Sequence, residues 1–467
     1  MQFSRSIFLY VLLPVLCLVV ARVLFGIDGL YGQDAYEYLR FTKELHAFWS
    51  GGVQPADFFW PVGYPFWGSL VAFVTSNEAI ALQILSVAAL IGSLIYLNEI
   101  LKLHAANRTA IKFYLVACFL LSPLVLRLSW LCMSDMLCVF FIAAHLYHFM
   151  RYKAEGKPLD LFFVVVFAGS AVFTRYGAAV PLLFTSLLTV IYFFRKPGIL
   201  RFAAGCAGVL LAVLPHFIFT SKGYFSFTDH PWLANWNAMN LFRSEFMTND
   251  GEISYQLPNL LFYLLDLFHP RFFILLAPLV IYALVKKIRM WNAYLLVAAC
   301  AYIIFLAGIP TQNSRFLLLA SPYVVILLYP VFEHAWKAMP YRKYVATGLI
   351  IANLALVFFG SRTIYDRTRF EQEIVASLNS KYSGRNIYSF DIDQALTGRN
   401  YNGRVFSLYE KLYDDFRPGD LILFAPEKFA VQWKNKKPMQ NWNRANADHE
   451  LVVKETFDDG WKLYEIR

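Results

Sequence analysis

Charged residues are scarce in this sequence of 467 residues. They make up 16% of the chain, whereas 58% is hydrophobic and the mean hydropathy is +0.48. A typical soluble domain has roughly a quarter of its residues charged, so this composition excludes an ordinary soluble protein. The formal net charge is +10. Because the positive side chains lie in short loops between apolar segments, we interpret them as topology determinants and expect no nucleic-acid partner.

Cysteine is also rare. The six cysteines lie in or beside apolar segments, none follows Cys300, and no CxxC pair is present. This pattern excludes a disulfide framework and a cysteine-based metal site. The sequence also has no internal repeat, and its C-terminal part has no glycine-rich phosphate loop.

Long apolar runs dominate the first 360 residues. A helix needs about 20 apolar residues to cross a bilayer, and by this criterion the sequence predicts about eleven spans. The first resembles a signal peptide but lacks a cleavage site, so we interpret it as an uncleaved span with a cytoplasmic N-terminus. The predicted spans are Ser6–Phe25, Ala79–Leu101, Ala110–Arg127, Leu131–Tyr152, Leu159–Thr174, Tyr176–Phe194, Leu200–Thr220, Arg271–Val285, Trp291–Ile309, Phe316–Phe332 and Tyr344–Gly360.

The charges divide between the two ends of these spans. Loops rich in Lys and Arg lie at one end, which the positive-inside rule assigns to the cytoplasm. The other end collects charges near the hydrocarbon, where they are costly and usually mark a polar cavity. We therefore expect such a cavity on the extracytoplasmic face. Its candidate residues are Asp28, Asp34, Glu37, Asp57, Arg127, Asp135, Arg175, His269, Arg271 and Arg315.

Two outer loops are too long to be simple turns, at residues 26–78 and 221–256. The first contains a predicted amphipathic helix, Asp34–Trp49, and then a short apolar segment ending at Val74, which we expect to be re-entrant or interfacial. The segment Leu257–Phe268 is predicted as a membrane-parallel helix or an additional half-span. Residues 1–360 thus form a transmembrane domain by this interpretation.

The composition changes after Gly360. Arg362–Ser380 has the pattern of an amphipathic helix, and five short strand patterns follow it, some separated by turn signals. The sequence predicts a small extracytoplasmic α/β domain at residues 361–467. We interpret it as accessory, with acceptor recognition as the alternative.

The acidic residues of the first outer loop allow two interpretations. Asp34 and Glu37 have the spacing of an acidic capping box at the start of a helix. A carboxylate at the rim of a polar cavity can also act as a general base for an acceptor hydroxyl or amine. Both hold together if the cap fixes the carboxylate. Asp135, at the start of a span, is expected to interact with its helix dipole, with a substrate contact as the alternative.

Four arginines, Arg127, Arg175, Arg271 and Arg315, occur at the outer ends of spans. Each alone is typical of an interfacial anchor or a carboxylate partner. Together they predict an anion site, because guanidinium groups match phosphate geometry and stay charged. A lipid-linked phosphate or pyrophosphate is the expected ligand, since its tail lies in the bilayer. His269 is more typical of a boundary residue than of a catalyst.

The order of these motifs resembles the GT-C membrane glycosyltransferases, in particular the branch of protein O-mannosyltransferases and aminoarabinose transferases. No single motif is specific; the order and the common sidedness carry the resemblance, from Asp28 to about Pro322. The motifs are Gln33-Asp34-Ala35-Tyr36-Glu37-Tyr38, Pro61-Val62-Gly63-Tyr64-Pro65, Ser122-Pro123-Leu124, Met133-Ser134-Asp135, Thr174-Arg175-Tyr176 and Gln312-Asn313-Ser314-Arg315-Phe316.

The resemblance implies transfer of a sugar from a polyprenyl-phosphate donor to an extracytoplasmic acceptor by an inverting displacement. Asp34 then takes the place of the acid that serves as base or positions the acceptor. Glu37 and Asp28 are alternative acids, because many relatives have adjacent acids in this motif, whereas this chain has Gln33-Asp34 with Glu37 three residues further on. Arg315, with Arg271 and Arg175, would hold the donor phosphate. Asp135, Tyr64 and His269 are expected to contact the acceptor or support the site.

Some GT-C enzymes use a divalent ion and others do not. With only scattered acids in this sequence, we predict no metal or other cofactor. Two rival functions remain at this stage: a flippase of lipid-linked sugars, which usually shows repeated halves, and a non-catalytic envelope assembly protein.

Overall fold

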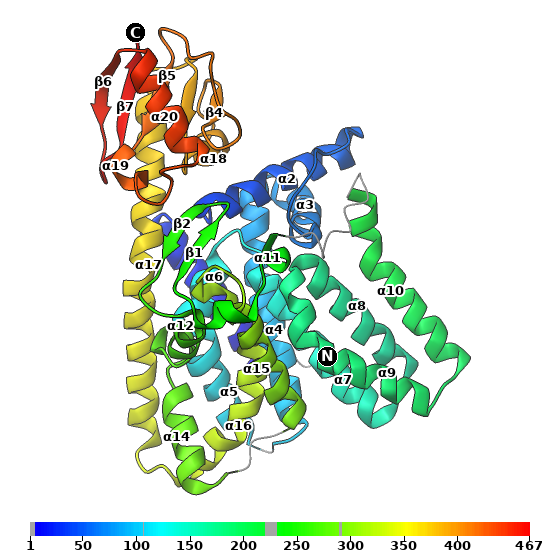
Figure 1. Cartoon of the computed structure of the whole chain (residues 1–467). Coiled ribbons are helices and arrows are strands. Elements are labelled where there is room, and N and C mark those ends of the chain that lie inside the picture. The colour runs from blue at the N-terminus through cyan, green and yellow to red at the C-terminus, as the bar shows by residue number, and fades with distance from the viewer. Residues whose placement is uncertain (1–4, 106, 220–230, 289–291) are drawn as a thin grey trace.

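A computed structural model describes residues 5–105, 107–219, 231–288 and 292–467. Helices form a large bundle, and a small domain with a five-stranded sheet stands at one end of it (Figure 1). The helices up to the C-terminal domain are α1 (Arg5–Phe25), α2 (Gly32–Gly51), α3 (Gly63–Thr75), α4 (Glu78–Lys102), α5 (Arg108–Tyr114), α6 (Pro123–Trp130), α7 (Asp135–Glu155), α8 (Pro158–Thr174), α9 (Ala179–Arg195), α10 (Ile199–Phe219), α11 (Pro231–Ala234), α12 (Asn259–Leu267), α13 (Pro270–Phe273), α14 (Leu276–Lys286), α15 (Ala293–Ala307), α16 (Ser321–Ala338) and α17 (Arg342–Lys381).

The number of spans is smaller by strict criteria than the sequence predicts. Six described helices are long and apolar enough to cross a membrane, or seven if the bent pair 108–120 and 123–130 forms one span. The apolar helices α8, α14 and α15 are shorter. The chain is therefore a multi-pass membrane protein, and the predicted count of eleven is not confirmed. The predicted half-span at 257–268 is the nine-residue helix α12, which is too short to cross a bilayer.

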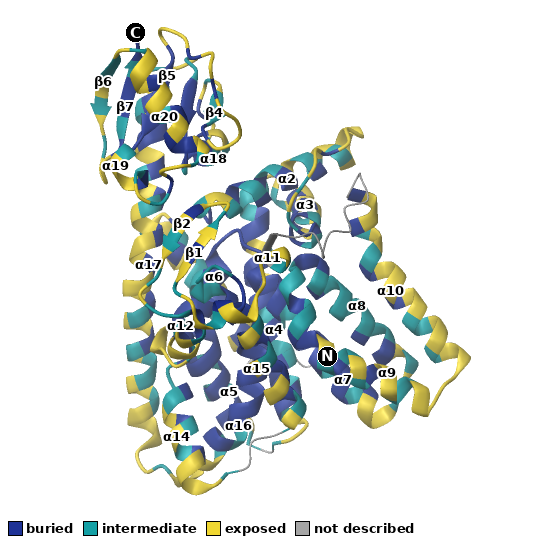
Figure 2. Ribbon diagram, viewed as in Figure 1, coloured by how far each residue is buried: buried dark blue, intermediate teal, exposed yellow. Residues whose placement is uncertain are grey.

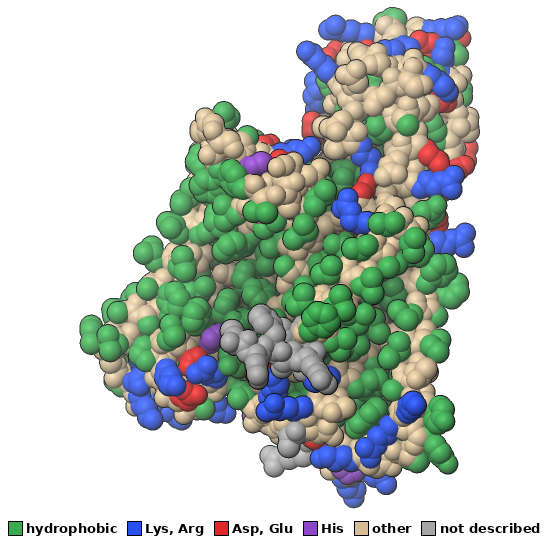
Figure 3. Space-filling view, turned by 180° about the vertical axis from the view of Figure 1, so that it is seen from behind, with side chains coloured by type: hydrophobic (Ala, Val, Ile, Leu, Met, Phe, Trp, Pro, Cys, Tyr) green, Lys and Arg blue, Asp and Glu red, His purple; other side chains and the backbone are tan. Residues whose placement is uncertain are grey.

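The surface of the bundle matches a bilayer environment. Exposed large hydrophobic side chains cover α1, α9 and α10, while the interior helices α4, α7 and α16 are mostly buried (Figure 2). In the space-filling view, hydrophobic side chains form a broad band, and Lys and Arg gather at its lower edge (Figure 3). The basic loops thus lie at one end of the bundle and the small domain at the other.

The first outer loop forms two helices, α2 and α3, that pack against each other and on α4. The predicted capping box is wrong. α2 begins at Gly32, its N-cap is Tyr31, and no side chain caps it. Asp34 and Glu37 lie inside the helix. Their carboxylates bind arginine side chains, described below, and not the backbone amides of the first turn. The predicted re-entrant or interfacial segment is α3, which has 13 residues.

Two further 3-10 segments and one π-helical segment shape the ends of the spans. The π-helix η1 (Leu115–Leu120) precedes the bend before α6, and Asn353 donates a hydrogen bond of 2.7 Å to its Ala117 carbonyl. π-helices inside apolar helices are often found near functional sites. The 3-10 segment η2 (Tyr176–Ala178) directly follows Arg175. The 3-10 segment η4 (Ser314–Ala320) contains Arg315. A third, η3 (Ala238–Phe242), precedes a hairpin of β1 (Glu245–Thr248) and β2 (Gly251–Ser254).

The C-terminal α/β domain is confirmed, with one correction. Its sheet has the order β4-β3-β5-β7-β6; β3 is parallel to β4 and β5, and β7 is antiparallel to β5 and β6. The predicted helix at 362–380 is not separate: α17 runs without a break through position 360, because one glycine without a proline costs a helix only about 1 kcal/mol. The elements are β3 (Ile387–Ser389), α18 (Asp393–Gly398), β4 (Val405–Ser407), β5 (Leu421–Phe424), α19 (Pro426–Phe429), α20 (Lys437–Asp448), β6 (Leu451–Thr456) and β7 (Lys462–Ile466).

Ion pairs fasten this domain to the bundle. Arg399, whose side chain is 7% exposed, bonds Asp28 of the first outer loop at 2.5 Å and Glu371 of α17 at 3.2 Å. Tyr36 of α2 donates a hydrogen bond to the same Glu371.

Within the domain, burial raises the pKa of Glu455, but hydrogen bonds from Lys381 and Ser377 outweigh this effect and hold that pKa below its ordinary value.

Candidate active site

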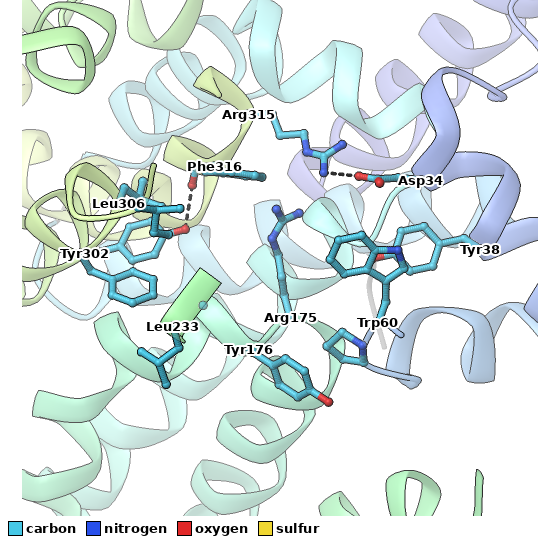
Figure 4. Close-up of a pocket in the computed structure, with 14 residues that line it drawn as sticks. Asp34, Tyr38, Trp60, Arg175, Tyr176, Leu233, Tyr302, Leu306, Arg315 and Phe316 are labelled. Atoms are coloured by element: carbon cyan, nitrogen blue, oxygen red, sulfur yellow. Dashed lines mark hydrogen bonds and ion pairs between the residues drawn. The ribbon is translucent and has the colours of Figure 1, made fainter. Parts of the chain in front are cut away.

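A small cavity of about 60 Å³ lies at the end of the bundle that faces the C-terminal domain. Side chains from α2, the α2–α3 loop, η2, α15 and η4 converge on it, although they are far apart in the sequence (Figure 4). It is lined by Asp34, Tyr38, Trp60, Pro61, Arg175, Tyr176, Gly177, Leu233, Tyr302, Phe305, Leu306, Ile309, Arg315 and Phe316.

Asp34 and Arg315 form an ion pair across this cavity (Figure 4). Asp34 lies in the first turn of α2, and Arg315 lies at the start of η4, where the Asn313 side chain accepts a hydrogen bond of 3.1 Å from the Arg315 backbone N–H. The two side chains are only 28% and 20% exposed. The sequence predicts both residues at the same outer site, and the structure brings them into direct contact.

A second ion pair lies deeper. Arg175, at the break between α8 and η2, bonds Asp135 at 2.5 Å, with side-chain exposures of 12% and 0%. Asp135 is in the first turn of α7, as predicted, and Arg175 is its partner. The other carboxylate oxygen of Asp135, Oδ2, lies 3.9 Å from Arg315 Nε. Neither of these two atoms has a hydrogen-bond partner within the described ranges. Two guanidinium groups and two carboxylates thus form one connected network.

Aromatic rings support both arginines. The centroid of the Phe316 ring lies 4.8 Å from Arg175 Cζ and 5.4 Å from Arg315 Cζ. At these distances the ring attracts both cations. Tyr302 donates a hydrogen bond of 2.9 Å to the Phe316 carbonyl and so fixes the start of η4 (Figure 4). The sequence analysis placed Phe316 in a motif but did not identify this role.

Tyr38 and Tyr64 hold the wall of the cavity on the α2 side. Tyr38 shares a hydrogen bond of 2.9 Å with Ser134, and its ring packs edge-on against Tyr64 at 5.2 Å. Tyr64 is fully buried, and its hydroxyl donates to the Leu82 carbonyl at 2.9 Å. Tyr64 therefore supports Tyr38 from behind and does not line the cavity.

Two of the other predicted acids lie outside this cavity. Asp28 bonds Arg399 of the C-terminal domain, and Glu37 bonds Arg40 through both carboxylate oxygens, at 2.8 and 2.7 Å. Glu37 instead lines a second, larger cavity. Of the three candidate acids, only Asp34 faces the guanidinium groups.

Arg271, His269 and Arg127 also lie outside the lining. Arg271 is paired with Asp266, donates to Ser314 at 2.9 Å and is 46% exposed. His269 accepts a hydrogen bond of 3.1 Å from the Arg271 backbone N–H and so caps α13, and Arg127 lies over the Tyr31 ring at 5.5 Å. Among the described residues, no group of three or more His, Cys, Asp or Glu side chains is arranged to hold a metal ion.

The apolar part of the lining was missed by the sequence analysis. Phe305 and Leu306 come from the end of α15, a helix that is apolar on all sides, and Ile309 follows two residues after it. A uniformly apolar helix gives no pattern that distinguishes a cavity-facing side chain from one that faces lipid or another helix. Only the polar motif that follows it, at Arg315, points to this region.

Comparison with solved structures gives a match along nearly the whole chain. ArnT from Cupriavidus metallidurans bound to undecaprenyl phosphate aligns with a TM-score of 0.61 and 11% identity, over 99% of this chain and 98% of that chain. The apo form of the same protein aligns with a TM-score of 0.60 and 12% identity, over 96% and 97% of the two chains. This chain therefore has the fold of ArnT.

The match includes the C-terminal domain, so the predicted fold class is confirmed. The S. cerevisiae Pmt1–Pmt2 complex bound to its sugar donor aligns over 51% of this chain and 36% of that chain, at 14% identity, with a TM-score of 0.37 that is too low to compare architectures. In sequence, no family model and no curated protein matches the chain significantly.

Proposed function

We propose that this protein is a membrane glycosyltransferase that moves a sugar from a polyprenyl-phosphate donor to an acceptor outside the cytoplasm. The observation that carries the proposal is the Asp34–Arg315–Asp135–Arg175 network, enclosed at one end of an apolar bundle with the ArnT fold. ArnT itself is bound to undecaprenyl phosphate in one solved structure.

The network suits a phosphate leaving group. Arg315 and Arg175 keep their charge in a low-dielectric setting and offer forked donors to phosphate oxygens. Asp34 accepts a hydrogen bond from Nη2 of Arg315. A bound donor phosphate would take over that pairing and release Asp34, which then accepts the proton of the attacking acceptor group. Arg175 stays oriented by the buried Asp135.

The apolar half of the lining suits the lipid part of the donor. Leu306, Phe305 and Ile309 face the same cavity as the guanidiniums. A prenyl chain entering from the bilayer would pack on these side chains while its phosphate reaches Arg315. Because phosphate is already a workable leaving group, positioning and fixed charges supply most of the rate enhancement.

The same proposal orients the chain. The basic loops at the far end of the bundle face the cytoplasm, by the positive-inside rule. The cavity and the C-terminal domain then face the outside of the inner, or plasma, membrane, and the N-terminus is cytoplasmic. We propose residues 1–360 as the membrane catalytic part and 361–467 as the outer domain, joined by the continuous helix α17.

The test is a transfer assay with purified protein in lipid nanodiscs, radiolabelled polyprenyl-phosphate sugars and envelope extract as acceptor. Asp34→Asn should lower the rate by at least about 100-fold, the usual contribution of a general base. Arg315→Met should weaken donor affinity by about 10- to 150-fold, the value of one charged hydrogen bond. Matched controls are Glu373→Gln and Arg271→Gln, which remove the same group types outside both cavity linings and should retain much more activity.

Two results would overturn the assignment. Full activity of Asp34→Asn would remove this residue from the chemistry. Movement of the donor across the bilayer by the protein without any covalent product would instead show a flippase. A non-catalytic assembly protein predicts a third pattern, in which removal of residues 361–467 abolishes function and no Asp34 substitution has an effect.

A further inference from the structure

A second cavity, of about 620 Å³, lies between α2 and the C-terminal domain. This volume falls within the usual range for small-molecule sites, about 300–1,000 Å³. Helix α18 contacts α2 directly, so the cavity has one wall from each domain (Figure 1). We call it the interdomain cleft. It is lined by Gln33, Tyr36, Glu37, Leu39, Arg40, Lys43, Ala56, Asp57, Asp393, Gln394, Thr397, Gly398, Val405, Ser407, Tyr409 and Glu410.

Helix α2 separates the interdomain cleft from the candidate active site. Asp34 and Tyr38, four residues apart, line the small cavity, whereas Gln33, Glu37 and Arg40 line the cleft. Residues three or four apart in a helix share a face, so two faces of one helix serve two cavities. A ligand in the cleft is therefore held within one helix diameter, about 10 Å, of the active site.

The cleft contains polar atoms that lack partners. Asp393 is 7% exposed, and its Oδ1 accepts no hydrogen bond within the described residues. Oε1 of the adjacent Gln394 is likewise buried and without a partner there. Buried oxygens of this kind are costly unless something donates to them. Burial raises the pKa of Asp393, in agreement with its shielded position.

The charges of the lining disfavour an anionic ligand. It includes four carboxylates, Glu37, Asp57, Asp393 and Glu410, against two cationic side chains, Arg40 and Lys43. Arg40 is also engaged, because it bonds both oxygens of Glu37 and, at 2.5 Å, Glu44. The lining therefore offers mainly acceptor oxygens and needs a ligand that donates.

Hydroxyl and aromatic groups complete the set. Thr397 donates to the Asp393 carbonyl at 3.3 Å and Ser407 bonds the Asp393 side chain, so their hydroxyl oxygens remain as acceptors, and Tyr409 leaves 42% of its surface exposed beside them. Hydroxyl-rich sugars donate to carboxylate and amide oxygens and pack their C–H faces on aromatic rings. We propose that the interdomain cleft binds a neutral, hydroxyl-rich glycan. Resting on the function proposed above, we further assign this glycan to the acceptor.

The experiment uses the full chain, labelled with a fluorophore and held in lipid nanodiscs so that no sugar-based detergent competes. It is applied to an array of neutral and anionic oligosaccharides, and the best-retained glycan is then titrated in solution. We expect retention of neutral glycans, and at least about tenfold weaker binding in Asp393→Ala and in Gln394→Ala. The second variant guards against a folding defect in α18. Asp448→Asn, on the exposed surface of α20, is the matched control and should bind normally.

Three results would overturn the inference: retention of no neutral glycan, a preference for anionic glycans, or binding that survives both cleft substitutions. The transfer assay is read separately. Arg315→Met should lower transfer at sub-saturating donor concentration yet leave glycan binding unchanged. Glycan binding at the cleft without any transfer by the wild-type protein would count against the proposed function and not against the cleft.

Discussion

The buried pair of Asp135 and Arg175 gives the sharpest test of the site's architecture. Asp135→Asn keeps the shape of the side chain but removes its charge. Arg175, whose side chain is 12% exposed, would then be left without its 2.5 Å partner. Arg315 would lose the carboxylate oxygen that lies 3.9 Å from its Nε. Arg315 would keep its pairing with Asp34, whereas Arg175 would keep no carboxylate partner among the described residues.

The expected cost follows from burial. Removing one partner of a buried ion pair typically costs about 3–5 kcal/mol, because the remaining charge is desolvated and uncompensated. Arg175→Met alone removes the 2.5 Å partner of Asp135, whose charge is fully buried. The double variant removes both charges. Its loss of unfolding free energy should therefore be smaller than the sum of the two single losses by at least about 2 kcal/mol.

The assay is equilibrium unfolding in mixed micelles with increasing SDS, followed by intrinsic fluorescence, for wild type, both single variants and the double variant. The exposed pair of Arg369 and Glu373, with side chains 64% and 55% exposed, is the matched control and should show no resolvable coupling. Additive losses for Asp135 and Arg175 would refute the reasoning, because they would mean that the pair contributes no mutual stabilisation.

Two further predictions concern the C-terminal domain. Arg399→Met should loosen its attachment, because Asp28 and the buried Glu371 lose their shared cation, and hydrogen exchange of α18 should become faster while that of β5 stays slow. Glu455→Gln should destabilise β6 at neutral pH. Since the pKa of Glu455 is lowered in the folded state, its contribution is present above about pH 4.5 and is lost as pH falls through the lowered pKa. Hydrogen exchange of β6 in the two proteins should therefore differ at pH 7 and converge in acid; an equal difference at both values would contradict this assignment.

Much of the architecture follows from the sequence because hydrophobicity and charge act locally. The outer ends of the spans carry Asp34, Asp135, Arg175 and Arg315, and their common sidedness is enough to predict that they share a cavity. The C-terminal strands can also be predicted, since turn residues separate short segments with strand patterns. The order of the motifs also leads to the expected fold, which the alignment with ArnT confirms.

The pairings within the site do not follow from the sequence. Asp28, Asp34 and Glu37 lie within ten positions and have the same chemistry, yet they bond Arg399, Arg315 and Arg40. Glu37 pairs with Arg40 three residues away, but Arg399 and Arg315 are distant along the chain, and packing that no local pattern encodes brings them to Asp28 and Asp34. The capping-box prediction failed because guanidinium groups bind both carboxylates in place of backbone amides, that of the distant Arg315 at Asp34 and that of the neighbouring Arg40 at Glu37.

The length of α17 has a mechanical consequence. Its 40 residues extend for about 60 Å, roughly twice the hydrocarbon thickness of a bilayer. One rigid rod therefore begins among the lipids and ends as a support of the sheet in the outer domain (Figure 1). If α17 tilts as membrane thickness changes, the C-terminal domain would move relative to α2 and the gap between them would change, so we expect lipid composition to affect what that gap admits.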